Sequence, residues 1–211
     1  MNGYSKIKSF AKINLALNVL GKSLSIHKIE SIVSFLGLND EIFVKEINKN
    51  KHIIKFIGKF SKNIGKINTI SKLLEILDKK NLLKDKKYAI KIKKNIPTQA
   101  GLGGGSMNAA TFFKYLIKKQ KIKISQKKIG EISNFVGSDV ILGMYCKNLI
   151  LKSNGSINII SKVESKNVLV IKPNFGCSTK KIYSKVKKFN SSRFKKPNKK
   201  LFSYLELKKM S

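Results

Sequence analysis

The segment from Ile96 to Thr111, "IPTQAGLGGGSMNAAT", places four glycines within five residues, directly before a pattern typical of a helix. Glycine allows positive φ and lets a ligand approach the backbone closely. The start of a helix adds unpaired N–H groups and a partial positive charge. A glycine loop in this position is typical of an anion site, and phosphate is the natural ligand. A simple connector between two elements is the alternative interpretation.

Other well-known phosphate loops do not fit this segment. A Walker A loop ends in Gly-Lys-Ser/Thr, whereas Gly105 is followed by Ser106 and Met107. A dinucleotide-binding loop reads G-x-G-x-x-G; Gly101 and Gly103 match it, but Ser106 takes the third place. The protein-kinase loop lies in a β-hairpin and comes with further signatures that this sequence does not contain.

Two charged residues stand inside apolar segments. Asp139 lies in "FVGSDVIL", where its neighbours imply partial burial in a chain with few acidic residues. It is a candidate general base, and an N-cap for a short helix beginning at Val140 is the alternative. Lys12 interrupts "FAKINLAL", and a solvated strand position is its alternative interpretation.

The loop and these residues need a scaffold, and the hydrophobic periodicity predicts one of the α+β class. Alternating and β-rich runs predict strands at 7–20, in two runs within 29–47 separated by a turn at Asn39-Asp40, and at 51–58, 88–96, 149–152, 157–160 and 168–172. Helical periodicity predicts helices at 68–83, 106–119 and 125–137, and a tail from 179 that is helical around a loop at 190–200.

The helix that follows the glycine loop has the clearest signals. Ser106 is expected as its N-cap, and the lysines at 118 and 119 suit its C-terminal end. Its apolar residues recur at helical spacing and predict a buried stripe of Ala109, Phe112, Phe113 and Leu116. The loop is therefore expected to be held against a packed core.

The composition limits the classes of function. The net charge of +34 suggests nucleic acid, but Arg193 is the only arginine, and lysine, asparagine and isoleucine are the residues of A/T-rich codons. Mutational bias with solvated lysine faces explains the charge, so no dedicated nucleic-acid partner is expected. Cys146 and Cys177 lack metal or disulfide spacing, and His52 is expected to be structural or exposed. We expect a soluble cytoplasmic protein, a monomer or homodimer, with no membrane partner.

At this level of detail the sequence resembles the GHMP family of small-molecule kinases. "PTQAGLGGGSMNAAT" resembles the family motif P-x-x-x-G-L-G-x-G-S-x-x-A-A. "SFAKINLALNVLGK" and "GSDVILG" resemble two further motifs of one branch, in the expected order. That branch phosphorylates 4-diphosphocytidyl-2-C-methyl-D-erythritol in the non-mevalonate isoprenoid pathway. The resemblance implies a GHMP kinase fold with a ribosomal-protein-S5-domain-2-like N-terminal domain.

The resemblance assigns roles to residues. Asp139 would be the base for the substrate hydroxyl, with Lys12 as its partner close in space. His27 would recognise cytosine and Tyr183 would stack on it, although Ser25 and Ile26 stand where the family has Gly-Tyr. Further substrate contacts are implied for Asn14 and Thr179. ATP contacts are implied for Asn68, Pro97, Thr98, Gln99, Ala100, Gly101, Leu102, Gly103, Gly104, Gly105, Ser106 and Met107.

The implied activity is ATP-dependent phosphorylation of the substrate 2-hydroxyl, with Mg²⁺ held mainly through the nucleotide phosphates and no metal site of the protein's own. Another acceptor, of the homoserine or mevalonate type, is one alternative. A degenerate, inactive member with a basic nucleic-acid-binding surface is another. We expect an ATP-binding domain over 1–160 and an incomplete C-terminal domain over 161–211, because the family's third glycine-rich motif does not occur in this sequence.

Overall fold

A computed structural model of the chain describes residues 3–23, 26–119, 122–163, 166–173, 176 and 182–210. Its strands are β1 Ser5–Ser23, β2 Ile26–Ile47, β3 Ile53–Ile57, β4 Lys87–Lys93, β5 Leu149–Leu151 and β6 Ile157–Ile159. Its helices are α1 Thr69–Lys79, α2 Gly104–Lys119, α3 Gln126–Val136, α4 Val140–Tyr145, the 3₁₀ helix η1 Lys199–Phe202, and α6 Tyr204–Lys208. Within the described residues, no helix is long and apolar enough to cross a membrane. The mixed content confirms the α+β class.

Packing divides the chain into two compact units that alternate along the sequence. The first unit comprises Met1–Ala11, Gly37–Thr98 and Leu102–Tyr145. The second comprises Lys12–Leu36, Gln99–Gly101 and Cys146–Ser211. The long strands β1 and β2 contribute residues to both units. A family domain boundary near residue 160 stays a prediction.

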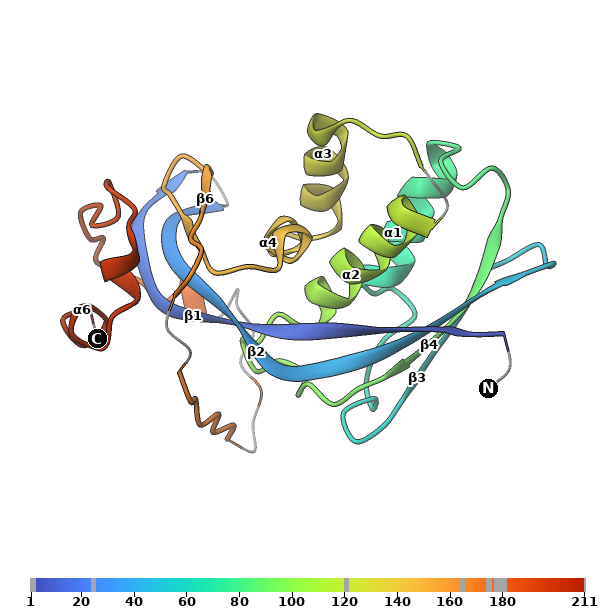
Figure 1. Cartoon of the computed structure of the whole chain (residues 1–211), viewed down its shortest axis with the longest axis horizontal. Helices are drawn as coiled ribbons and strands as arrows, with labels where there is room; N and C mark the ends of the chain where they lie inside the picture. The colour runs from blue at the N-terminus through green and yellow to red at the C-terminus, as the bar shows by residue number, and fades with distance from the viewer. Residues whose placement is uncertain are drawn as a thin grey trace. The chain divides into compact units, whose positions relative to one another are not determined.

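In the first unit, helices cover one face of a sheet. Strand β4 pairs parallel with β3, from Ile53 opposite Ala89, and antiparallel with β2. Two parallel neighbouring strands need a crossover between them, and α1 provides it. Figure 1 shows α1 and α2 on the same side of these strands. The helix that follows the glycine loop therefore packs directly on the sheet.

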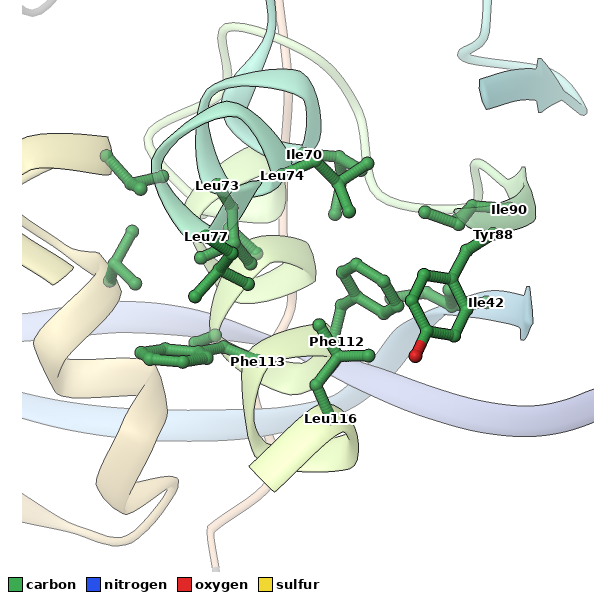
Figure 2. Close-up of a cluster of buried hydrophobic side chains, with 14 of the residues drawn as sticks. Ile42, Ile70, Leu73, Leu74, Leu77, Tyr88, Ile90, Phe112, Phe113 and Leu116 are labelled. Atoms are coloured by element: carbon green, nitrogen blue, oxygen red, sulfur yellow. The ribbon is translucent and has the colours of Figure 1, made fainter. Parts of the chain in front are cut away.

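The core of the first unit lies between these two layers. Side chains from α1, α2 and the strands converge in it, and Tyr88 meets Phe112 edge to face with ring centroids 6.2 Å apart (Figure 2). The stripe expected on α2 is confirmed, because all four of its residues are fully buried. The buried residues of this core include Ile42, Ile70, Leu73, Leu77, Tyr88, Ile90, Ile92, Phe112, Phe113 and Leu116.

The second unit is built on an antiparallel extension of β2. Strand β5 pairs with it through Ile32 opposite Ile150, and β6 pairs with β5. A smaller core contains Ile32 and Ile150 from these strands, together with Phe194 and Phe202 from the tail. The C-terminal tail is thus fixed to the strands by two buried aromatic rings.

Three expectations about secondary structure are wrong. The turn at Asn39-Asp40 does not form, because β2 runs unbroken through it and hydrogen bonds satisfy the Asp40 carboxylate. Helix α2 begins at Gly104, so Ser106 lies in its first turn, and the Met107 N–H bonds the Gly103 carbonyl at 2.8 Å. Residues 168–172 form no strand in the described part of the chain, because a β-rich run becomes a strand only where a neighbour pairs with its backbone.

His52 is structural, as expected. Its Nδ1 accepts the Tyr88 backbone N–H at 3.0 Å, so Nε2 carries the proton and donates to Asp78 at 3.1 Å. Protonation of Nδ1 would remove the first of these bonds. Burial lowers the pKa of His52, and the nearby Lys87 acts in the same direction against the opposing effect of Asp78.

We expect His52 to titrate below the ordinary histidine value of about 6.5. The neutral ring then stabilises the fold fully above that pH, and this contribution is lost as the pH falls through the folded-state pKa. The two histidines of the chain can be followed by their ring proton resonances in an NMR pH titration, with a His27→Gln variant for assignment. A His52 resonance that titrates at 6.5 or above would contradict this expectation.

Candidate active site

The glycine loop lies in the connection between β4 and α2. The backbone is in the left-handed region at Gln99, Gly101 and Gly103, with φ of 53°, 72° and 65°. Glycine takes this conformation without strain, which explains two of the three positions. Leu102 is buried between them and fixes the loop to the protein. The loop is therefore shaped by both backbone and packing.

The buried carboxylate of Asp40 holds the two ends of this loop. Its Oδ1 accepts the backbone N–H groups of Asn95 and Ile96 at 2.7 and 2.8 Å. Its Oδ2 accepts the side-chain amide of Asn108, in the second turn of α2, at 3.0 Å and also the Lys94 ammonium. One carboxylate thus joins β2, the end of β4 and the start of α2.

Sequence reasoning took Asp40 for a turn residue and missed this role. A signal was present, because an acidic residue inside a β-rich run of an acid-poor chain needs a reason. That same argument singled out Asp139.

Replacing Asp40 by asparagine should destabilise the protein by about 3–5 kcal/mol, because it leaves the Lys94 ammonium buried without its counter-charge. Urea unfolding measures the loss. The matched control is Glu75→Gln, which removes an exposed carboxylate paired with Lys79 and should change the stability by less than about 0.5 kcal/mol. Lys94→Met should recover part of the loss in the Asp40→Asn background. Equal unfolding midpoints for Asp40→Asn and Glu75→Gln would refute the anchoring role.

The N-terminus of a second helix lies beside the loop. The Thr69 hydroxyl at the start of α1 donates to the Gly105 carbonyl at 2.7 Å. The first turns of α1 and α2 read "TISK" and "GGSM", so neither contains a carboxylate that would neutralise the helix dipole. Two partial positive charges therefore lie side by side. Thr69 was not recognised in the sequence, where one threonine at a helix start gives no distinct signal.

Asn68 caps α1. Its Oδ1 accepts the backbone N–H groups of Ile70 and Ser71 at 3.0 and 3.1 Å, and its amide donates to the carbonyls of Gly65 and Lys66. These bonds explain the asparagine at this position by its structural role as the N-cap of α1. Its contact with a nucleotide stays a prediction.

Ser106 and Asp139 belong to neighbouring turns of the first unit. A methyl group placed on Gly137 would lie 3.5 Å from the Ser106 hydroxyl oxygen, so the first turn of α2 adjoins the turn that leads to Asp139. Asp139 directly precedes α4, and its carbonyl accepts the Gly143 N–H at 3.3 Å. It therefore holds the position expected of an N-cap, two residues after the glycine that adjoins the first turn of α2.

The bulk of Met107 is accommodated by a glycine. Met107 is buried, and a methyl group on Gly143 would lie 3.0 Å from its sulfur and 2.6 Å from the Ala110 side chain. Helices α2 and α4 approach closely because Gly143 has no side chain. Met107 and Gly143 are far apart in the sequence, so their contact could not be predicted from it.

Lys12 and Asn14 lie together in the second unit. The Lys12 ammonium is buried and donates to the side-chain Oδ1 of Asn14 at 3.4 Å, and the Ser31 hydroxyl donates to the same oxygen at 3.2 Å. Lys12 is therefore not a solvated strand residue. The expected pairing of Lys12 with Asp139 joins residues of different units and stays a prediction.

His27 and Tyr183 lie together in the second unit, and their expected contacts with the substrate base stay predictions. Their rings are stacked with centroids 5.1 Å apart and an angle of 21° between the planes. Both side chains are half-buried. The contact with Thr179 falls outside the described residues.

Comparison with known proteins gives this geometry a family. Residues 68–147 match the GHMP kinases N terminal domain. A Pelagibacter ubique protein named 4-diphosphocytidyl-2-C-methyl-D-erythritol kinase is 55% identical over 100% of this chain and 74% of its own length. Proteins of the same name from Thermoanaerobacter pseudethanolicus and Fusobacterium nucleatum are 34% and 36% identical, over 88% and 87% of this chain. The chain belongs to the GHMP kinase family.

Solved structures show the same fold. A crystal structure of a 4-(cytidine 5'-diphospho)-2C-methyl-D-erythritol kinase matches 74% of this chain and 55% of its own, with a TM-score of 0.60 and 21% identity. The mevalonate pyrophosphate decarboxylase of Streptococcus pyogenes matches 85% and 58%, with a TM-score of 0.60 and 16% identity. The chain spans 63% of the length of the Thermoanaerobacter and Fusobacterium relatives.

Proposed function

We propose that this protein transfers the γ-phosphate of ATP to the 2-hydroxyl of 4-diphosphocytidyl-2-C-methyl-D-erythritol. The observation that carries the proposal is the meeting of two helix N-termini, whose first turns contain no acidic residue, at a glycine loop, joined by the Thr69–Gly105 hydrogen bond. The names of relatives at 55%, 34% and 36% identity select the acceptor. ATP use follows from membership of the kinase family.

The phosphate end of the site would be formed by the backbone N–H groups of the loop and of the first turn of α2. These groups and the two helix dipoles favour the negative charge of the β- and γ-phosphates. The Ser106 hydroxyl would contact a phosphate oxygen or Mg²⁺. Among the described residues no group of three or more His, Cys, Asp or Glu side chains could hold a metal ion. We expect Mg²⁺ to arrive with ATP, held by its phosphates, where it would neutralise charge on the transferred group.

Transfer needs a base for the hydroxyl proton. The substrate oxygen attacks the γ-phosphorus, the bond to the ADP oxygen breaks, and the hydroxyl proton passes to the Asp139 carboxylate. The Lys12 ammonium would favour loss of the substrate hydroxyl proton by stabilising the negative charge that develops on the attacking oxygen. No covalent intermediate with the protein is required.

The cytidyl end of the substrate would lie in the second unit. Tyr183 offers a ring face for stacking, and the His27 imidazole offers a donor and an acceptor for the polar edge of cytosine. Asn14, on the same strand as Lys12, would contact the methylerythritol part. With a homoserine- or mevalonate-type acceptor, the His27–Tyr183 pair would have no cytosine to bind.

An acceptor panel tests the substrate assignment. Purified protein is given ATP and Mg²⁺ with the cytidyl substrate, homoserine or mevalonate, and ADP release is followed. Only the cytidyl substrate should support turnover. Turnover with another member of the panel, or with none, would overturn the proposed acceptor.

Asp139→Asn should lower kcat by about 10²–10⁴-fold, because the amide cannot accept the hydroxyl proton. Asparagine caps helices about as well as aspartate, so this variant preserves the structural role of the position. The unfolding midpoint should therefore change little, and affinity for ATP should persist in calorimetry. Asp85→Asn, in the loop before β4, is the control and should retain full activity. A normal kcat in folded Asp139→Asn protein would refute the assignment.

A further inference from the structure

Glu30 is a buried carboxylate that the proposed reaction does not use. It lies on β2, is 1% exposed, and receives four hydrogen bonds. Its Oε1 accepts the Asn18 amide at 3.0 Å and the Arg193 backbone N–H at 2.6 Å. Its Oε2 accepts the Ser192 hydroxyl at 2.7 Å and the Phe194 backbone N–H at 3.4 Å.

These bonds fasten the tail of the second unit to two strands. Asn18 belongs to β1, Glu30 to β2, and residues 192–194 to the tail. The Asn190 N–H adds a bond to the Val19 carbonyl at 2.9 Å, and the Phe194 ring is fully buried beside Ile32. The segment 190–194 is therefore held by both polar and apolar contacts, with Glu30 at the centre of the polar ones.

The stacked rings of His27 and Tyr183 belong to the two segments that Glu30 joins, β2 and the C-terminal tail. His27 precedes Glu30 by three residues on β2, and Tyr183 precedes the fastened segment by seven residues. A turn closed by the Val186 N–H and the Tyr183 carbonyl, at 3.1 Å, shortens that connection. The attachment at Glu30 thus limits where the Tyr183 ring can lie relative to His27.

We propose that Glu30 is the positioning residue of the base-binding ring pair, and that it sets the affinity for the cytidyl part of the substrate by fixing Tyr183 against His27. The substrate part of this inference rests on the proposed function. The ring geometry does not, so the two can be tested separately.

A carboxylate suits this position better than an amide. Each oxygen of Glu30 faces a backbone N–H, Arg193 on one side and Phe194 on the other, and backbone donors cannot become acceptors. Glutamine in either orientation would point its NH₂ group at one of them. Burial raises the pKa of Glu30, but the four donors outweigh it and hold the pKa below its ordinary value, so the carboxylate is ionised at neutral pH.

Glu30→Gln tests the inference by its separate effects on the KM for the cytidyl substrate and on the KM for ATP. The variant should raise KM for the cytidyl substrate about tenfold and leave KM for ATP unchanged. Glu75→Gln, an exposed carboxylate on α1, should change neither value. Ser192→Ala removes a single donor and should raise the cytidyl KM in the same direction by a smaller factor, which keeps the test available if Glu30→Gln folds poorly. A purely structural role would lower the amount of folded protein without changing the ratio of the two KM values, and would overturn the inference.

A second measurement is independent of activity. The Tyr183 ring should shift the NMR resonances of the His27 ring protons, and Tyr183→Leu provides the reference without that shift. Glu30→Gln or Ser192→Ala should move the His27 resonances toward this reference. His27 resonances that stay at the wild-type position in both variants would overturn the inference. Loss of the proposed function would appear differently, as absence of cytidyl turnover in the wild-type protein with the ring shift intact.

Discussion

The hydrogen-bonded carboxylate of Asp40 is the constraint on which the geometry of the glycine loop depends. A flexible loop binds phosphate well only if its N–H groups are already oriented, because ordering it on binding costs conformational entropy. Asp40 reduces this cost by fixing the backbone of Asn95 and Ile96 before the loop and the Asn108 side chain after it. The ion pair with Lys94 compensates the buried charge. The glycines can then let a ligand approach the backbone closely while both ends of the loop stay in place.

The scarcity of acidic residues makes each buried one informative. The chain has 45 basic and 11 acidic residues, so lysine on the surface needs no specific explanation, whereas a carboxylate in an apolar segment does. Asp40 and Glu30 are the fully buried acids of the described residues, and each joins segments far apart in the sequence. Asp139, half-buried in the turn before α4, is the acid proposed to act on substrate. The same chemical group thus serves as a structural centre in two places and as a candidate base in a third.

The sequence predicted those features that depend on local pattern. The helical periodicity of α1 and α2, the alternation in β4 and the glycine loop are all visible within short windows, and the structure confirms them. Features that depend on long-range contacts were missed or misread. Asp40 resembles a turn residue until Asn95, Ile96 and Asn108 are placed around it. Residues 168–172 are a β-rich apolar run but have no strand to pair with in the described part of the chain. The family motif assigned His27 and Tyr183 to the same substrate base, but the direct stacking of their rings was not predicted, because residues 156 positions apart give no local signal of contact.

The proposed reaction specifies which oxygen of the substrate carries the transferred phosphate. The carbon that bears the 2-hydroxyl in the proposed substrate also bears the methyl group and has no hydrogen of its own. A phosphate on that oxygen therefore has no three-bond coupling to a proton, whereas a phosphate on any other hydroxyl of the methylerythritol chain does. The decisive measurement is a ³¹P NMR spectrum of the product formed from ATP and the cytidyl substrate. Transfer to the 2-hydroxyl should give a new phosphomonoester resonance without proton coupling. A proton-coupled resonance, or an unchanged spectrum, would exclude transfer to that oxygen.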